Sequence, residues 1–160
     1  LALLKKDFQT AVSLVDLHEV QQHLVNNPND YIGALQKVPF KILKIYVHSV
    51  QSFFWNKIAE KTTIEEIPFI AFDTEFENKV IEDEYEKLLE KYNLSQRDFV
   101  IRQFQNLTPQ GGSRKRIAQV KELKIGKLEN DEINNKKVVV EFILPKGSYA
   151  TVFIKSLFSY

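Results

Sequence analysis

The spacing of the apolar residues changes about two-thirds of the way along the chain, and this change most constrains the fold. Through most of the first 107 residues, apolar side chains recur every three or four positions, which is typical of amphipathic helices. After the turn-forming TPQGG at 108–112, short β-prone runs take over, and KKVVVEFIL at 136–144 is the strongest of them. Helices followed by antiparallel strands predict an α+β fold, with helices plus an antiparallel sheet.

Proline and asparagine residues divide the first 39 residues into separate predicted helices. Residues 1–26 predict helical structure, and NNPND at 26–30 ends it. A short helix over 30–37 follows, with Asp30 as its N-cap. Pro39 then interrupts the pattern.

Two longer elements are expected next. Residues 41–61 predict a long helix, although KILKIYV is β-prone and a strand is the alternative. Residues 62–79 are expected to be irregular. IEDEYEKLLEKY at 81–92 predicts an acidic surface helix that ends at Asn93, and Ser95 caps a further short helix. The buried stripe of the acidic helix is expected to consist of Tyr85, Leu88, Leu89 and Tyr92.

The last third predicts strands and a closing helix. RKRIAQV at 114–120 and KELKIGKLE at 121–129 are expected to be strands, and DEINN at 131–135 the loop of a hairpin. A helix capped by Ser148 should follow Pro145.

Composition excludes several classes of protein and site. The chain has no cysteine, which excludes disulfides and thiolate metal sites and fits a reducing cytosol. Its histidines, His18, His23 and His48, are too scattered to suggest a zinc cluster. No apolar run approaches the roughly 18–20 residues that span a membrane. The net charge of +1 neither demands nor excludes a nucleic-acid partner.

The beginning of the chain is unusual for a natural reading frame. It starts with Leu1, contains no methionine and shows no signal peptide. We therefore expect a processed or trimmed piece of a longer protein.

The stretch YVHSVQSFFWN at 46–56 places polar side chains among aromatic ones. On a helix, His48, Gln51 and Ser52 share one face, and Asn56 lies beside them. One interpretation is a packing helix whose polar groups bond to neighbouring backbone. The alternative is the wall of a cleft, where amide and imidazole groups contact RNA while an aromatic ring stacks on a base.

Three further segments could carry chemistry. PQGGSRKR at 109–116 joins paired glycines to a basic run that suits RNA phosphate, or forms a solvated hairpin. LPKGSYAT at 144–151 could hold an anion at a helix N-terminus, or be a glycine turn with a serine cap. Asp7 could be an activated carboxylate, but a surface residue in a first helical turn is the simpler interpretation.

Several of these stretches together resemble one enzyme family, tRNA pseudouridine synthase D (TruD). VHSVQSFFWN resembles the family's V-H-A-Y-Q-S-Y-x-[FW]-N segment, and LPKGSYATVFIKSL its L-P-K-G-S-Y-A-T-V-x-L-R-E-L ending. IPFIAFDT is similar to P-x-x-G-Y-D-T, and GGSRKRI to a G-x-Y-R segment. The chain departs from the family pattern at Val50 for Tyr, Ala71 for Gly, Ser113 for an aromatic, and Lys155–Ser156 for Arg–Glu. These departures suggest an archaeal or otherwise distant member.

The resemblance implies an enzyme that isomerises uridine to pseudouridine in tRNA, by family precedent at uridine-13, without a cofactor or metal. The target nucleotide would be extruded into a pocket, and an aspartate would act as nucleophile or base. That aspartate belongs to a G-x-K-D segment upstream of N-Y-F-G-x-Q-R-F-G, and this chain contains neither motif. Its role is not transferred to Asp7, so no catalytic residue is expected in this chain.

The same resemblance implies how the chain is organised. Residues 1–37 would be the C-terminal part of an inserted helical domain, and 38–160 the C-terminal half of the catalytic domain. The expected partners are tRNA and the missing N-terminal half of the enzyme, and the expected location is the cytoplasm. Residues implied in RNA binding or in lining the cleft are His48, Gln51, Ser52, Asn56, Arg114, Lys146, Ser148 and Tyr149. The alternatives are a non-catalytic RNA-binding module with the same fold and a purely structural domain.

Overall fold

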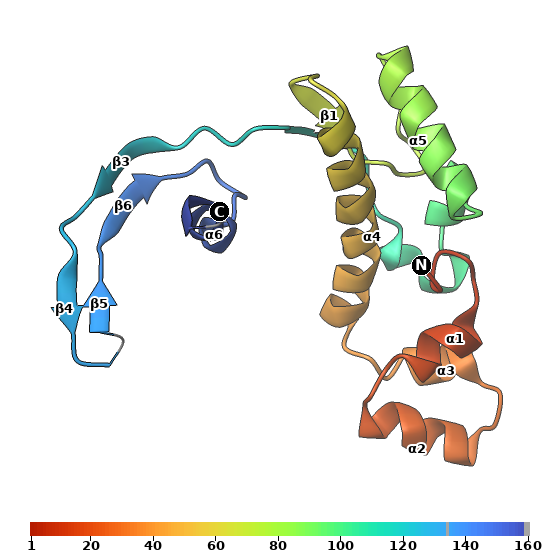
Figure 1. Cartoon of the computed structure of the whole chain (residues 1–160). Helices are drawn as coiled ribbons and strands as arrows, with labels where there is room; N and C mark the ends of the chain where they lie inside the picture. The colour runs from red at the N-terminus through yellow and green to blue at the C-terminus, as the bar shows by residue number, and fades with distance from the viewer. Residues whose placement is uncertain (134, 159–160) are drawn as a thin grey trace. The chain divides into compact units, whose positions relative to one another are not determined.

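The computed structural model describes residues 1–133 and 135–158, and it forms two compact units. The first unit, Leu1–Arg116, contains most of the helices and one short β-ladder. The second unit, Ile117–Tyr160, contains the remaining strands and a final helix (Figure 1). The α+β class that the sequence predicts is therefore confirmed.

The helices of the first unit largely follow the predicted pattern. The expected helix over 1–26 is two helices, because the chain turns between Ser13 and His18. Asp30 does cap the next helix, since its carboxylate accepts a hydrogen bond from the Gly33 N–H. The strand alternative for 41–61 is wrong, because this stretch is one continuous helix. The bounds are α1 Phe8–Ser13, α2 His18–Asn26, α3 Tyr31–Leu35, α4 Phe40–Lys61 and α5 Lys79–Lys91, followed by the 3-10 helices η1 Gln96–Phe99 and η2 Arg102–Leu107.

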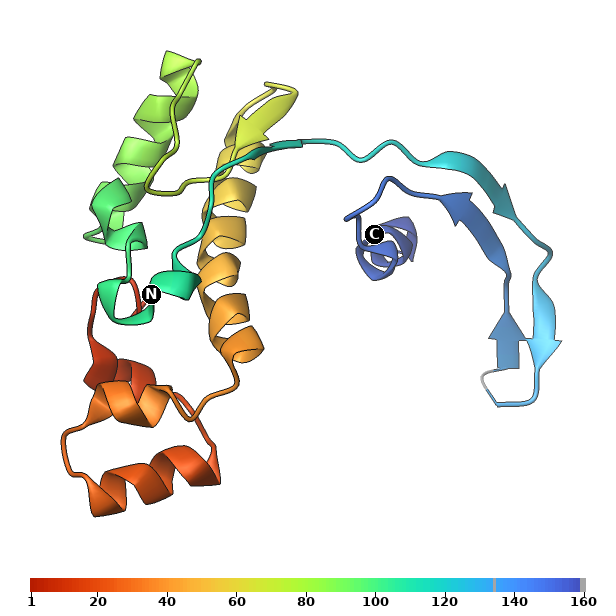
Figure 2. The same ribbon diagram turned by 180° about the vertical axis from the view of Figure 1, so that it is seen from behind.

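The core of the first unit forms around α4. One stripe of this helix is buried at intervals of three or four residues: Leu43, Val47, Val50, Phe54 and Ile58. Helix α5 lies beside α4 in both Figure 1 and Figure 2 and buries Ile81, Tyr85, Leu88 and Leu89. The predicted stripe of α5 is thus confirmed, although Tyr92 is only half-buried.

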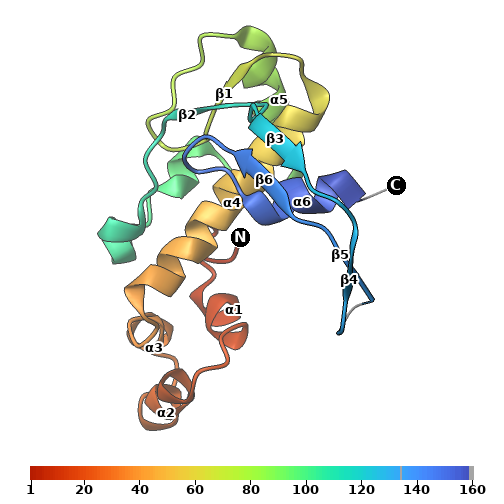
Figure 3. The same ribbon diagram turned by 90° about the vertical axis from the view of Figure 1, so that its left-hand side faces the viewer.

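The short helices α1, α2 and α3 gather near the first turns of α4 (Figure 3). Their buried residues, among them Ala11, Val20 and Leu35, join the same core cluster as α4. Across the part of the chain that the structure describes, no helix combines the length and apolar character that crossing a bilayer requires.

A short ladder joins distant parts of the first unit. Strand β1, Glu66–Pro68, pairs antiparallel with β2, Ser113–Lys115, and Ile67 stands opposite Arg114. The prediction that 62–79 is irregular is therefore wrong for these three residues. The ladder brings the loop at 108–112 back to the end of α4, which the spacing of apolar residues did not indicate.

The second unit is an interrupted hairpin and a helix. Strand β3, Lys121–Ile125, pairs with β6, Val140–Ile143, while β4, Glu129–Asp131, pairs with β5, Asn135–Lys137 (Figure 2). The predicted hairpin around 131–135 is confirmed, with Asn134 outside the described residues. The ladder breaks beside Gly126, where an added Cβ would lie 3.1 Å from the Val139 carbonyl oxygen.

The predicted antiparallel sheet is confirmed in part. The described residues form three separate two-stranded ladders. Of the expected RKRIAQV strand, residues 116–120 do not form a strand. Helix α6, Ala150–Phe158, confirms the closing helix, and it begins one residue later than a Ser148 cap would place it. The first helical hydrogen bond, from the Phe153 N–H, is accepted by the Tyr149 carbonyl.

The second unit buries little of its apolar surface. None of its described side chains is fully buried, although Phe142 and Phe153 meet edge to face with ring centroids 4.7 Å apart. Ile125, Ile143 and Val152 are each at least half exposed. Because a two-stranded hairpin is at best marginally stable in water, this unit is expected to need a further packing partner.

The two faces of α4 predict different sensitivities to the same substitution. Ile58→Ala should lower the free energy of unfolding by about 2–5 kcal/mol, because Ile58 is 1% exposed and its truncation leaves a cavity. Ile45→Ala on the same helix should change it by less than about 0.5 kcal/mol, because Ile45 is 60% exposed. Urea unfolding followed by Trp55 fluorescence measures both, and equal losses would contradict the burial of this face.

Candidate functional site

Three buried side chains hold the backbone of residues 67–70. Trp55 Nε1 donates to the Ile67 carbonyl at 3.0 Å, and Gln51 Nε2 donates to the Ile70 carbonyl at 2.9 Å. From α5, the Tyr85 hydroxyl donates to the Pro68 carbonyl at 2.6 Å. Burial raises the pKa of Tyr85, so this phenol remains a donor at any physiological pH. Segment 67–70 is thus fixed between α4 and α5.

The turn after this segment is closed by its own side chains. Thr74 Oγ1 accepts from the Ala71 N–H and donates to the Phe69 carbonyl, both at 2.8 Å. Asp73 Oδ1 accepts from the Gly111 N–H at 3.1 Å. A Cβ on Gly111 would lie 3.2 Å from that same oxygen, so glycine allows the two loops to approach. The AFDT sequence therefore anchors the loop at 108–112.

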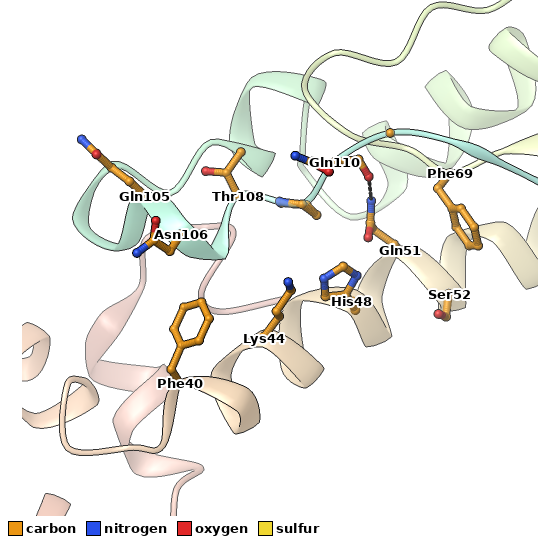
Figure 4. Close-up of a pocket in the computed structure, with 12 residues that line it drawn as sticks. Phe40, Lys44, His48, Gln51, Ser52, Phe69, Gln105, Asn106, Thr108 and Gln110 are labelled. Atoms are coloured by element: carbon orange, nitrogen blue, oxygen red, sulfur yellow. Dashed lines mark hydrogen bonds between the residues drawn. The ribbon is translucent and has the colours of Figure 1, made fainter. Parts of the chain in front are cut away.

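These contacts leave a groove between α4 and residues 105–111. Its volume is about 750 Å³. Figure 4 shows Phe40, Lys44 and His48 in series along α4, facing Asn106 and Thr108 from the opposite wall. We call it the Lys44 groove; its lining residues are Phe40, Lys44, His48, Gln51, Ser52, Phe69, Gln105, Asn106, Thr108, Pro109, Gln110 and Gly111.

His48 and Lys44 differ in charge state inside this groove. Burial lowers the pKa of the His48 imidazole, and the positive charge of Lys44 lowers it further. A hydrogen bond with Gln51 acts in the opposite direction but is the smallest of the three effects. His48 is therefore neutral at pH 7 and can both donate and accept a hydrogen bond.

The side chains that line the groove offer groups suited to binding a ligand. Its lining offers amides, two hydroxyls, a neutral imidazole and one cation, but no aspartate or glutamate. Carboxylate nucleophile or base chemistry therefore has no group within the lining that could perform it. Among the residues that the structure describes, no three histidine, cysteine or acidic side chains are grouped so as to hold a metal ion.

The predicted residues of α4 divide between two roles. Gln51 is 3% exposed and bonds to backbone, which matches the packing interpretation, and it also donates to the Gln110 carbonyl at 3.3 Å. His48 and Ser52 line the groove, as the cleft interpretation expects. Asn56 is exposed on the same helix and lies outside the lining. Their contact with RNA stays a prediction.

The other predicted residues lie elsewhere. Arg114 is on β2, and its guanidinium Cζ lies 5.4 Å from the centre of the Trp55 ring. Lys146, Ser148 and Tyr149 belong to the second unit, in and after the turn that precedes α6. Lys146 and Tyr149 are exposed there.

Sequence reasoning missed several groove residues. Phe40 and Lys44 continue the four-residue spacing of His48 and Ser52 toward the start of α4, so that signal was present in the sequence. Gln105 and Asn106, in contrast, stand in a 3-10 helix whose approach to α4 no local pattern indicates.

Comparison with known proteins shows the family. The model of the family described as "tRNA pseudouridine synthase D (TruD)" matches residues 3–69 and 59–157. These two overlapping segments cover nearly the whole chain. The chain therefore belongs to the TruD family, as the sequence motifs indicate.

Individual relatives are similar but much longer. Two proteins named "Probable tRNA pseudouridine synthase D" match, at 27% identity over 94% of this chain in Methanosarcina acetivorans and 29% over 97% in Nanoarchaeum equitans. A crystal structure described as the TruD protein of Methanosarcina mazei shares the fold, with a TM-score of 0.76 over 96% of this chain at 20% identity. This chain covers 46%, 44% and 55% of those three proteins, or about half their length.

The buried amide of Gln51 predicts a loss of stability on replacement. Gln51→Met should cost about 1–3 kcal/mol of unfolding free energy, because the carbonyls of Ile70 and Gln110 lose a donor. Gln22→Met is the matched control, because Gln22 is exposed on α2. Chemical denaturation of both variants measures the difference, and an unchanged Gln51→Met midpoint would show that this amide anchors nothing.

The lowered pKa of His48 predicts that this residue makes the folded chain less stable as the pH falls. Its folded-state pKa lies below the unfolded value, so the unfolded chain binds more protons as the pH falls through the usual histidine range of about 6.5. Stability should therefore decrease from pH 7.5 to pH 5, and His48→Gln should make that decrease shallower. Urea unfolding at a series of pH values tests this, and a steeper decrease in the variant would contradict the lowered pKa.

Proposed function

We propose that this chain is part of an enzyme that isomerises uridine to pseudouridine in tRNA, with uridine-13 as the target by family precedent. The observation that carries the proposal is the family match, which runs from residue 3 to residue 157. In this proposal the chain contributes RNA-binding surface. The catalytic aspartate comes from a G-x-K-D segment that this chain does not contain.

The structure supports a need for a second half. The chain covers about half the length of the relatives it matches, and its second unit has no fully buried described side chain. Both are expected if 38–160 is half of a catalytic domain and 1–37 the end of an inserted helical domain. The partners in this proposal are the N-terminal half and tRNA, the enzyme needs no cofactor, and its location is the cytoplasm.

The proposed roles of individual residues follow from their positions. His48, Gln51, Ser52 and Asn56 form or flank the cleft on α4. Arg114 and Lys146 supply positive charge for phosphate, and Ser148 and Tyr149 present a hydroxyl and an aromatic ring beside the turn before α6. The exposure of Lys146 and Tyr149 supports such contacts.

A non-catalytic RNA-binding module is the second candidate. It accounts for the same groove, whose lining offers binding groups and no carboxylate, without requiring a catalytic segment. This alternative predicts salt-dependent binding of tRNA with no catalytic segment encoded alongside.

An assay with and without the upstream segment distinguishes the synthase proposal from the binding-module alternative. The chain alone should form no pseudouridine in a tRNA transcript, because it lacks the aspartate. The same chain continued upstream through G-x-K-D should form it, and Asp→Ala in that motif should abolish conversion. Carbodiimide labelling followed by primer extension detects the product. Failure of the complete protein to convert any cellular RNA would reject the synthase proposal.

A further inference from the structure

Two cavities of similar volume meet at Gly111 but differ in charge. The Lys44 groove has a volume of about 750 Å³, and a second cavity between residues 64 and 113 has about 760 Å³. Gly111 lines both. The second cavity, which we call the acidic cavity, is lined by four carboxylates and no lysine or arginine; they belong to Glu66, Asp73, Glu75 and Glu77.

This contrast determines where a polyanion can lie. A phosphate in the acidic cavity would face several negative charges at short range, each interaction being unfavourable even in a high dielectric. The Lys44 groove has a lysine and no carboxylate, and Lys44 forms no ion pair with any residue that the structure describes. Its ammonium is therefore available to an incoming anion, and an RNA strand is directed into this groove and away from the neighbouring cavity.

The remaining groove residues suit a base. Phe40 is the first residue of α4, is 47% exposed and lies on the same face as Lys44. Phe69 also lines the groove. Exposed aromatic rings provide stacking platforms for unpaired bases. The wall opposite α4 consists of residues from 105 to 111, and Figure 4 shows the Asn106 carboxamide extending toward Phe40, where it can donate to or accept from a base edge.

We propose that the Lys44 groove binds one nucleotide of single-stranded RNA adjacent to the reacting uridine, with its phosphate at Lys44 and its base against Phe40. This proposal rests on the proposed function and adds a second nucleotide site to it. The lining has no carboxylate of its own, and in the proposed function the carboxylate comes from the upstream segment, so the effects of Lys44→Gln on KM and kcat distinguish a neighbouring nucleotide from the reacting uridine. Single-stranded RNA is required because bases within a duplex are stacked and cannot enter a groove.

The first test compares two lysines of the same helix. Lys44→Gln should weaken binding of an unstructured oligoribonucleotide by the full 160-residue chain roughly three- to tenfold, as expected for the loss of one solvent-exposed hydrogen-bonded contact. It should also reduce the slope of log K against log salt by about 0.7, because one phosphate contact is lost. Lys41→Gln is the control, because Lys41 is exposed one turn earlier on α4 and does not line the groove.

A second pair of variants tests the aromatic contact. Phe40→Leu should weaken the same oligonucleotide roughly fivefold or more, because base stacking on the ring is lost. Phe72→Leu should leave binding unchanged, because Phe72 is 54% exposed but lies outside the groove. A duplex of equal length should compete poorly for the wild-type chain, and effective competition by that duplex would contradict the single-strand requirement.

The assay of the complete protein separates this inference from the proposed function. If the groove holds a neighbouring nucleotide, Lys44→Gln should raise KM for tRNA with little change in kcat. A collapse of kcat with unchanged KM would place the reacting uridine there and overturn the proposal. Equal effects of Lys44→Gln and Lys41→Gln on binding would also overturn it. If wild-type protein binds through Lys44 yet forms no pseudouridine, the synthase proposal fails, and only the binding of single-stranded RNA in the groove is retained.

Discussion

The backbone of residues 67–70 is buried beside α4, and the rest of the first unit depends on how its carbonyl groups are satisfied. A three-residue strand paired on one edge provides few ladder hydrogen bonds, and a buried carbonyl without a donor is costly. Gln51 and Trp55 from α4 and Tyr85 from α5 supply the missing donors. One segment thereby fixes the two main helices relative to each other.

The same hydrogen bonds position the candidate site. Gln51 spans Ile70 and Gln110, and Asp73 holds the Gly111 N–H, so the loop at 108–112 is held at a defined distance from α4. Because Gln51 is engaged in these hydrogen bonds, the other polar residues of this helix face line the groove; they are Lys44, His48 and Ser52. The packing and cleft interpretations of this helix thus apply to different residues of one face.

The sequence predicted what depends on local pattern. The stretch 41–61 was correctly predicted as a helix, and Asp30 and Asn93 marked helix boundaries because their side chains and backbone preferences act locally. The family motifs predicted TruD membership, which the family match confirms. The pairing of β1 with β2 escaped prediction, because it joins residues almost fifty positions apart through only three pairs. Gln105 and Asn106 escaped for the same reason, and the proposed roles of Arg114 and Lys146 stay predictions.

The most direct measurement is photo-crosslinking of the chain to single-stranded RNA that contains 4-thiouridine, with the modified peptides mapped by mass spectrometry. The account predicts crosslinks on α4 around Phe40–His48 and on the facing residues 105–111. Crosslinks concentrated on residues 64–78 around the acidic cavity, with none on α4, would contradict it, because the RNA would then lie where the structure places the negative charge.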